Sequence, residues 1–291
     1  YRNAAPYGKA LLYCDAVTSW SWLAFRKYDF AANPLQFTEA LLPMMKSNAR
    51  ELEKMKYADA IGIDFHKAGF SPYTSSFFAY RDAGEFEALL QRPGSAYLQS
   101  RTDYNPYHYT LEVSRAATGA VAGWATMKYF GYEGFQACLG SILENHLVMR
   151  NLLQAEPSTV CVNPQDNGMV TLLRIYPQGV DAQEQYQHEL TDPAYKPQLS
   201  AHNQLTLDIG NKLYAWFREG KQINGMHTPY MSFTTGFCVT EYNRDAADPD
   251  AKVFALKIYI MNMHLTPELM KHVLDCIMAA RDEVVGQELQ Q

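Results

Sequence analysis

A lysine and an aspartate follow two apolar runs near the start of the sequence, and both side chains suit covalent catalysis. Lys67 closes the tetrapeptide Asp64-Phe65-His66-Lys67, directly after the apolar run 58–63. Asp15 follows the run Leu11-Leu12-Tyr13-Cys14. A lysine in an apolar setting or beside a cation is a better amine nucleophile, because its neutral form is favoured there.

Each of these residues lies where a buried strand is expected to end. Segments 9–14 and 60–64 are largely apolar, as strands buried on both faces are. In an open α/β sheet the carboxyl ends of the strands border the ligand crevice. Taken alone, Asp15 also fits a turn or helix cap, and Lys67 an ordinary strand-to-loop turn.

Together, a lysine and a carboxylate at such an edge are the two groups that pyridoxal 5'-phosphate requires from a protein. The lysine forms the Schiff base and the carboxylate keeps the pyridine nitrogen protonated. The pair therefore predicts an enzyme that uses this cofactor, with Lys67 and Asp15 in those two roles.

The composition argues against several other classes of protein. Of 291 residues, 47% are hydrophobic and 19% are charged, as in globular proteins. The net charge of −6 disfavours a nucleic-acid partner, and no apolar run is long enough for a membrane span. The five cysteines are far apart and lack CxxC spacing, so we expect no metal site, no disulfide framework and a cytoplasmic protein.

The rest of the chain predicts helices and strands in alternation. Two helices are expected over 116–130 and 133–153, with Gly131 as the stop between them. Further elements are expected as strands 159–162, 169–176, 230–233 and 253–260, a helix over 204–217 with Leu205, Ile209, Leu213, Trp216 and Phe217 on one stripe, and a last helix from Thr266. A domain boundary is expected near Pro157, which separates 1–156 from 157–291.

Several stretches together resemble one family, the group II pyridoxal-phosphate-dependent decarboxylases, which includes aromatic amino acid, tyrosine and glutamate decarboxylases. The stretches are Tyr13-Cys14-Asp15-Ala16-Val17, the run from Ala58 to Lys67, Ser71-Pro72-Tyr73, Phe78-Ala79-Tyr80-Arg81-Asp82, and the tract from Ser114 through Trp124 to Gly134. The resemblance covers residue 11 to about residue 153. It implies the fold-type-I α/β class: the C-terminal part of the large mixed-sheet domain over 1–156, and a small α+β domain over 157–291.

The resemblance also implies roles for individual residues. Lys67 is expected to form the Schiff base, and a buried Asp15 to pair with the pyridine nitrogen. His66 is expected near the cofactor phosphate, and Val17 under the ring, where the family usually has alanine. Phe65 departs from the family, which usually has proline or a small residue there.

Hydroxyl and phenol groups are the less specific candidates. Ser75, with its neighbours Thr74 and Ser76, is a candidate ligand of a phosphate. The family protonates its product with a tyrosine on a mobile loop, and in the tyrosine-rich segment 93–109 the candidates are Tyr97 and Tyr104, then Tyr107. Each of these side chains also fits a packing role at a subunit interface or a strand start.

The C-terminal segment contains Lys257 and His264, near the place where related enzymes bind the substrate carboxylate with an arginine. The stretch from Ala255 to His264 has no arginine, so that role is not transferred to either residue. The lack slightly disfavours an aminotransferase, because a decarboxylase need not hold the carboxylate that it expels.

The expected activity is decarboxylation of an L-amino acid to its amine and carbon dioxide. Two alternatives remain open: another reaction of the same cofactor, such as transamination or aldehyde-forming oxidative decarboxylation, and a non-catalytic partner subunit. Tyr1 is not a methionine, and the first expected strand follows almost at once. We therefore expect that an N-terminal segment or chain completes the site, in a homodimer or a heteromer.

Overall fold

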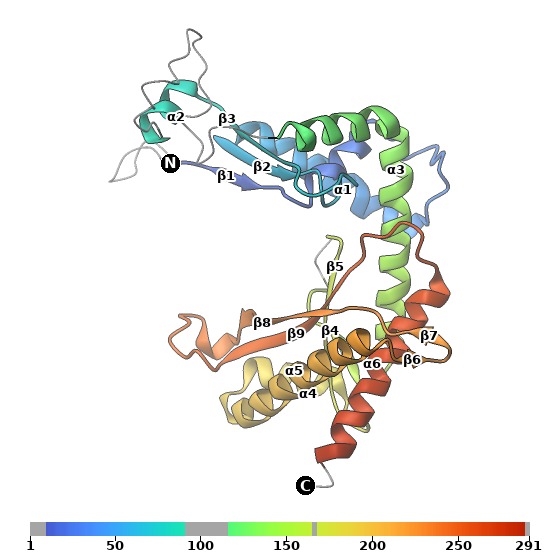
Figure 1. The fold of residues 1–291 in the computed structure, drawn as a ribbon. Helices are drawn as coiled ribbons and strands as arrows, with labels where there is room; N and C mark the ends of the chain where they lie inside the picture. The colour runs from blue at the N-terminus through green and yellow to red at the C-terminus, as the bar shows by residue number, and fades with distance from the viewer. Residues whose placement is uncertain (1–9, 91–115, 165–167, 289–291) are drawn as a thin grey trace. The chain divides into compact units, whose positions relative to one another are not determined.

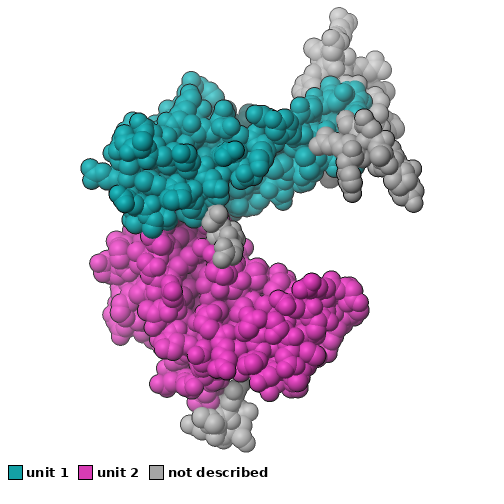
Figure 2. Space-filling model, turned by 180° about the vertical axis from the view of Figure 1, so that it is seen from behind, with its two compact units in different colours: residues 1–139 teal, residues 140–291 magenta. Residues whose placement is uncertain are grey.

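The computed structural model describes residues 10–90, 116–164 and 168–288. Figure 1 shows the course of the chain, which divides into two compact units, Tyr1–Leu139 and Gly140–Gln291 (Figure 2). The division falls inside helix α3, Thr118–Ala155. The boundary predicted near residue 157 separates segments by their kind of secondary structure rather than by compactness, and it stays a prediction.

A three-stranded mixed sheet organises unit 1. Its strands are β1 Tyr13–Asp15, β2 Ala60–Asp64 and β3 Ser76–Tyr80, in the order β1-β2-β3. β1 runs parallel to β2 with Asp15 opposite Gly62, and β3 runs antiparallel with Ser76 opposite Asp64. The parallel pairing places the carboxyl ends of β1 and β2 at the same edge of the sheet, as the sequence predicted.

The predicted burial of the first strand is wrong. Leu11, Leu12 and Tyr13 are 51%, 47% and 53% exposed, and Phe77 and Phe78 on β3 are also about half exposed. In the described sheet β1 is an edge strand, so one of its sides has no neighbour. Apolar composition indicated burial, but the described residues cover only about half of the surface of each of these side chains.

Short helices connect β1 to β2 and build the core of unit 1. They are the 3-10 segments Trp20–Lys27, Glu39–Leu41 and Glu53–Tyr57 and the helix α1, Leu42–Leu52. These helices and the loop between residues 27 and 39 contribute buried side chains, which include Trp22, Phe25, Tyr28, Phe37 and Met45. After β3 comes α2, Ala83–Leu90.

Helix α3 contains a break at Gly131, where φ is +59°. This left-handed conformation strains residues that have a Cβ atom, but glycine adopts it freely. The predicted stop at Gly131 is therefore confirmed.

Unit 2 is built on a four-stranded antiparallel sheet in the order β4-β5-β9-β8. The strands are β4 Thr159–Cys161, β5 Val170–Ile175, β8 Ser232–Val239 and β9 Lys252–Tyr259, and a small hairpin joins β6 Gln222–Ile223 to β7 Met226–His227. The helices are α4 Ala182–Thr191, α5 Lys196–Glu219 and α6 Pro267–Glu288, with 3-10 turns at Pro193–Tyr195 and Glu241–Asn243. α5 packs against β8, β9 and α6. Within the described residues, no helix has the length and apolarity to cross a membrane.

The buried stripe of α5 matches the prediction at four positions and differs at one. Leu205, Ile209, Leu213 and Trp216 are buried, whereas Phe217 is 46% exposed. Neighbouring residues of a helix point about 100° apart. Because Trp216 already occupies the stripe, Phe217 turns outward, where its ring lies 5.7 Å from that of Tyr230.

A buried ionic cluster lies in the core of unit 2. Arg174 on β5 and Glu189 on α4 are fully buried, and their charged groups are 2.8 Å apart. Arg174 also donates to Asn203 Oδ1 at 2.6 Å, and Tyr176 donates to Glu189 at 3.1 Å. His202 contacts the other carboxylate oxygen of Glu189. Both charges are thus surrounded by partners, which offsets the cost of removing them from water.

Replacement of Glu189 by glutamine should destabilise the protein by about 3–5 kcal/mol, because it leaves the Arg174 charge buried without a counter-charge. Urea unfolding would measure this loss. The control is Glu184→Gln on the same helix, whose side chain is 72% exposed and should change stability by at most about 0.5 kcal/mol. Equal effects of the two substitutions would contradict this account of the cluster.

Candidate functional site

The turn after β2 places Lys67 at the carboxyl edge of the unit 1 sheet. Its Nζ lies 2.7 Å from Asp64 Oδ2, and the Lys67 side chain is 31% exposed, so the amine is paired yet accessible. Asp64 Oδ1 accepts a hydrogen bond of 2.6 Å from the Ser76 hydroxyl, and His66 Nε2 lies 3.6 Å from Oδ2. Asp64 is therefore the centre of the cluster, although the sequence marked it only as part of a motif.

The environment of Asp64 favours its ionised form. Burial of the side chain opposes ionisation, but hydrogen bonds from Lys67 and Ser76 and the charges of Lys67 and His66 outweigh it. Together they hold the pKa of the Asp64 carboxyl below its usual value. Asp64 therefore presents an anionic carboxylate to the Lys67 amine at neutral pH.

His66 and Ser75 lie next to each other across the turn that joins β2 to β3. His66 Nδ1 is 3.1 Å from the backbone nitrogen of Ser75 and 2.9 Å from its carbonyl oxygen. The Tyr73 ring covers the imidazole at a centroid distance of 4.1 Å. The Ser75 hydroxyl is buried and donates to the Gly119 carbonyl of α3 at 2.6 Å. The structure thus groups the predicted His66, Lys67 and Ser75, and their roles toward a phosphate stay predictions.

Asp15 lies at the same edge, one strand away. It is opposite Gly62, and the Ala16 N–H donates to the Gly62 carbonyl at 2.9 Å. The Asp15 carboxylate accepts from the backbone N–H of Val17 at 3.2 Å, so these two predicted residues form one small turn. The expected burial of Asp15 is not found, because the described residues leave it exposed at the end of an edge strand.

An aromatic cluster packs against the turn that follows β2. Trp20 donates its indole N–H to the Asp64 carbonyl at 3.0 Å, and its ring meets that of Phe65 edge-on at 5.0 Å and that of Phe135 at 6.0 Å. A Cβ atom at Gly69 would come within 2.8 Å of both the Phe65 backbone and the Trp20 ring, so only glycine fits there. The departure at Phe65 therefore has a packing role. Its partners lie far apart in the sequence, so no spacing pattern indicated it.

Two charged residues of the sequence motif hold the strands rather than a ligand. Asp59 is buried and accepts the Leu12 N–H at 2.8 Å, at the start of β1. Arg81 donates to the Ala58 carbonyl through Nε at 3.0 Å and Nη2 at 2.9 Å. These two residues of the motif thus provide hydrogen-bond partners for backbone groups near the ends of the strands.

The tyrosines predicted as proton donors, Tyr97 and Tyr104, lie outside the described residues, as does Tyr107. Their role stays a prediction.

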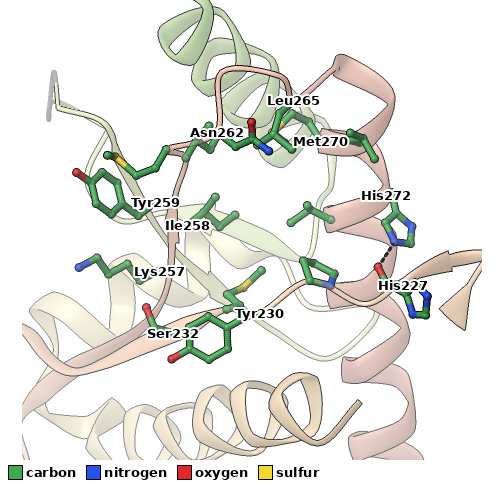
Figure 3. Close-up of a pocket in the computed structure, with 16 residues that line it drawn as sticks. His227, Tyr230, Ser232, Lys257, Ile258, Tyr259, Asn262, Leu265, Met270 and His272 are labelled. Carbon is green, nitrogen blue, oxygen red and sulfur yellow. Dashed lines mark hydrogen bonds between the residues drawn. The ribbon is translucent and has the colours of Figure 1, made fainter. Parts of the chain in front are cut away.

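Unit 2 contains a separate cavity of 540 Å³ (Figure 3). It is bordered by β8, by β9 and the loop that follows it, and by α6, and Lys257, Tyr259 and Asn262 are among its lining residues. His272 Nε2 on α6 donates to the His227 carbonyl at 3.0 Å at one end of the cavity. Of the two C-terminal residues noted in the sequence, Lys257 lines this cavity and His264 does not.

Comparisons with known proteins agree with the sequence motifs. No family model matches the chain. A probable L-tyrosine/L-aspartate decarboxylase of Methanothermobacter thermautotrophicus is 29% identical over 101 residues, which are 33% of this chain and 26% of that protein. The solved structure of Oryza sativa TDC with PLP and tryptamine has a TM-score of 0.56 at 14% identity and covers 94% of this chain. A Rhodiola rosea 4-hydroxyphenylacetaldehyde synthase has a TM-score of 0.56 at 13% identity and also covers 94%.

The chain has the fold of the C-terminal part of pyridoxal-phosphate-dependent decarboxylases. The predicted fold class and the resemblance to this group are thereby confirmed. The chain spans 45% of the length of the Oryza sativa protein and 44% of that of the Rhodiola rosea protein. The likeness therefore concerns about half of such a decarboxylase.

The Asp64 cluster should make stability depend on pH in the acid range. Because the pKa of Asp64 is lowered on folding, its stabilising effect is fully present above the ordinary value of 3.8 and is lost as pH falls through the folded value. We expect Asp64→Asn to cost about 1 kcal/mol of unfolding free energy above that pH and less below it. Denaturant unfolding at a series of pH values measures the difference.

Ser76→Ala is the matched control, because it removes a hydrogen bond to the same carboxylate without removing the titrating group. A loss for Asp64→Asn that stays constant well below pH 3.8 would contradict the assignment.

Proposed function

We propose that this chain carries the cofactor-anchoring lysine of a pyridoxal-phosphate-dependent decarboxylase, which converts an L-amino acid to its amine and carbon dioxide. One observation carries the proposal: the Lys67 amine is accessible at the carboxyl edge of β2, one strand from Asp15 at the end of β1. The decarboxylase fold and the similarity to a probable L-tyrosine/L-aspartate decarboxylase support it.

The residues at this edge fit the chemistry of the cofactor. Lys67 provides an amine for the covalent link, and Asp15 provides an exposed carboxylate for the pyridine nitrogen. His66 precedes Lys67 in the same turn, where a phosphate would meet its imidazole, whereas the Ser75 hydroxyl already donates to the Gly119 carbonyl. Val17 follows Asp15 in the same turn, and we assign it to the position under the ring on the resemblance to the decarboxylases. When bound, pyridoxal phosphate supplies an electron sink for the carbanion that loss of carbon dioxide leaves.

Residues of this chain are assigned to the proton transfers that accompany this chemistry. Asp15 is assigned to keep the pyridine nitrogen protonated by charge pairing, because a cationic ring accepts electrons better than a neutral one. Lys67 is assigned to be displaced by the substrate amine. Tyr97 or Tyr104 is assigned to protonate the product carbon, on the resemblance to the decarboxylases alone.

A second reaction on the same fold is aldehyde formation, since the Rhodiola rosea protein of similar structure is an aldehyde synthase. Transamination is a further alternative. Product analysis separates the three, because decarboxylation yields an amine and carbon dioxide, whereas the others yield an aldehyde or a keto acid. A non-catalytic subunit would yield none of these, and the presence of both Lys67 and Asp15 argues against it.

The Schiff-base role of Lys67 can be tested without knowledge of the substrate. The chain would be incubated with excess pyridoxal phosphate and borohydride, which reduces the covalent link to a stable amine. We expect peptide mass spectrometry to find the pyridoxyl group on Lys67. In Lys67→Ala that label and any decarboxylation should fall below detection.

Lys196→Ala is the control, because Lys196 forms a comparable ion pair with Asp248 at 2.6 Å in unit 2 and has no assigned role. It should retain the label on Lys67. A pyridoxyl group found mainly on another lysine would refute the assignment.

We further propose that another polypeptide surface, from an N-terminal segment or a partner chain, covers the unit 1 sheet and completes the site. The support is the apolar surface of its outer strands, where Leu11, Leu12, Tyr13, Phe77 and Phe78 are each about half exposed. Large exposed apolar side chains gathered on the same strands are typical of interaction surfaces.

The chain by itself should therefore not form a monomer that holds stoichiometric cofactor. Sedimentation velocity measures its association state, and absorbance after gel filtration measures the bound cofactor. A well-folded monomer of this chain that retains one cofactor per chain would overturn this proposal.

A further inference from the structure

The carboxylate of Asp64 and the amine of Lys67 form the closest charge contact at the candidate site. We propose that Asp64 is a positioning residue for Lys67. Its carboxylate holds the Lys67 amine at the sheet edge and restrains the reaction of that amine with carbonyl compounds until a ligand separates the two side chains. The inference deepens the proposed function. It rests on that function only in taking the cofactor as the carbonyl compound that reacts with Lys67.

The two oxygens of Asp64 have different partners. Oδ1 accepts the Ser76 hydroxyl at 2.6 Å, and Oδ2 faces Lys67 Nζ at 2.7 Å. Asp64 and Ser76 are also paired directly between β2 and β3, so both the backbone and the side chain of Asp64 are held in place. A fixed anion defines one position for the mobile Lys67 amine.

The charges around Asp64 strengthen this arrangement. Within the described residues that face it, His66 and Lys67 are the titratable groups, and the side chain of Asp64 is only 13% exposed. The Trp20 indole N–H also donates a hydrogen bond to the Asp64 backbone carbonyl. An ion pair shielded from water in this way is stronger than one between fully exposed groups.

Chemistry at Lys67 requires this pair to open. An ammonium nitrogen has no free lone pair, so it must first give up a proton before it attacks a carbonyl carbon. The new C–N bond then forms, the carbonyl oxygen leaves as water, and the nitrogen regains one proton, so that ammonium and aldehyde give a protonated imine and water. As long as Lys67 Nζ is paired with the Asp64 carboxylate at 2.7 Å, the amine is held away from a carbonyl ligand.

The opposing interpretation is that Asp64 only stabilises the turn. Two substitutions separate the interpretations, because both weaken the same local structure and only one removes the charge. Asp64→Asn removes the anion that faces Lys67. Ser76→Ala removes the other hydrogen bond of the carboxylate and leaves the anion in place.

The experiment measures the reactivity of Lys67 in the chain without added cofactor. Formaldehyde with cyanoborohydride as reductant methylates lysine amines, and peptide mass spectrometry gives the rate at each lysine. We expect Lys67 to react about fivefold faster in Asp64→Asn than in the wild type. In Ser76→Ala its rate should change less than about twofold, although thermal unfolding should show both variants to be less stable than the wild type.

Asp248→Asn provides an internal control, because Asp248 pairs with Lys196 at 2.6 Å in unit 2. It should leave the rate at Lys67 unchanged. An unchanged Lys67 rate in Asp64→Asn, or an equal rise in Ser76→Ala, would overturn the proposal.

These rates do not depend on the identity of the cofactor. A faster Lys67 in Asp64→Asn combined with no pyridoxyl label on Lys67 would support the pairing and reject the proposed function. A pyridoxyl label on Lys67 with no effect of Asp64→Asn on the methylation rate would do the reverse.

Discussion

The parallel pairing of β1 with β2 is the constraint on which the candidate site depends. It sets Asp15 opposite Gly62, so the residues that follow each strand emerge at one edge of the sheet. A slip of one residue would turn every side chain of β1 to the opposite face. The pairing is secured outside the ladder by Asp59, which accepts the Leu12 N–H, and by Trp20, which donates to the Asp64 carbonyl.

Each of the two units contains a paired carboxylate, and the two pairs have different consequences. In unit 2, Glu189 is fully buried with Arg174, Tyr176 and His202 around it. Its partners are all held in the core, so the cluster stabilises one packing arrangement. In unit 1, the Asp64 side chain is 13% exposed and is paired with Lys67, whose side chain is 31% exposed. Only an accessible, breakable pair of this kind leaves a reactive group available to a ligand.

Much of the local structure could be predicted because it depends on neighbours in the sequence. The strands around 60–64, 169–176 and 253–260 follow from apolar runs, and the break at Gly131 follows from the conformational freedom of glycine. The grouping of His66 and Lys67 was equally predictable, since both lie in one turn. Predictions that depended on coverage by other parts of the chain were less successful, and the exposure of Leu12, Asp15 and Phe217 is the clearest example.

By itself the sequence determined the residue types that chemistry at this site needs, and the strand ends that carry them. It also contains the motifs that resemble the decarboxylase family, and that resemblance implied the fold. Only the tertiary structure decided that Asp64 is the partner of Lys67, that Phe65 packs against Trp20, and that the Ser75 hydroxyl is used by Gly119. The contacts of Phe65 and Ser75 join residues about 45 positions apart, so they depend on how the strands and helices pack together. Asp64 and Lys67 are only three residues apart, but the conformation of the turn and the Ser76 hydrogen bond decide that their charged groups meet.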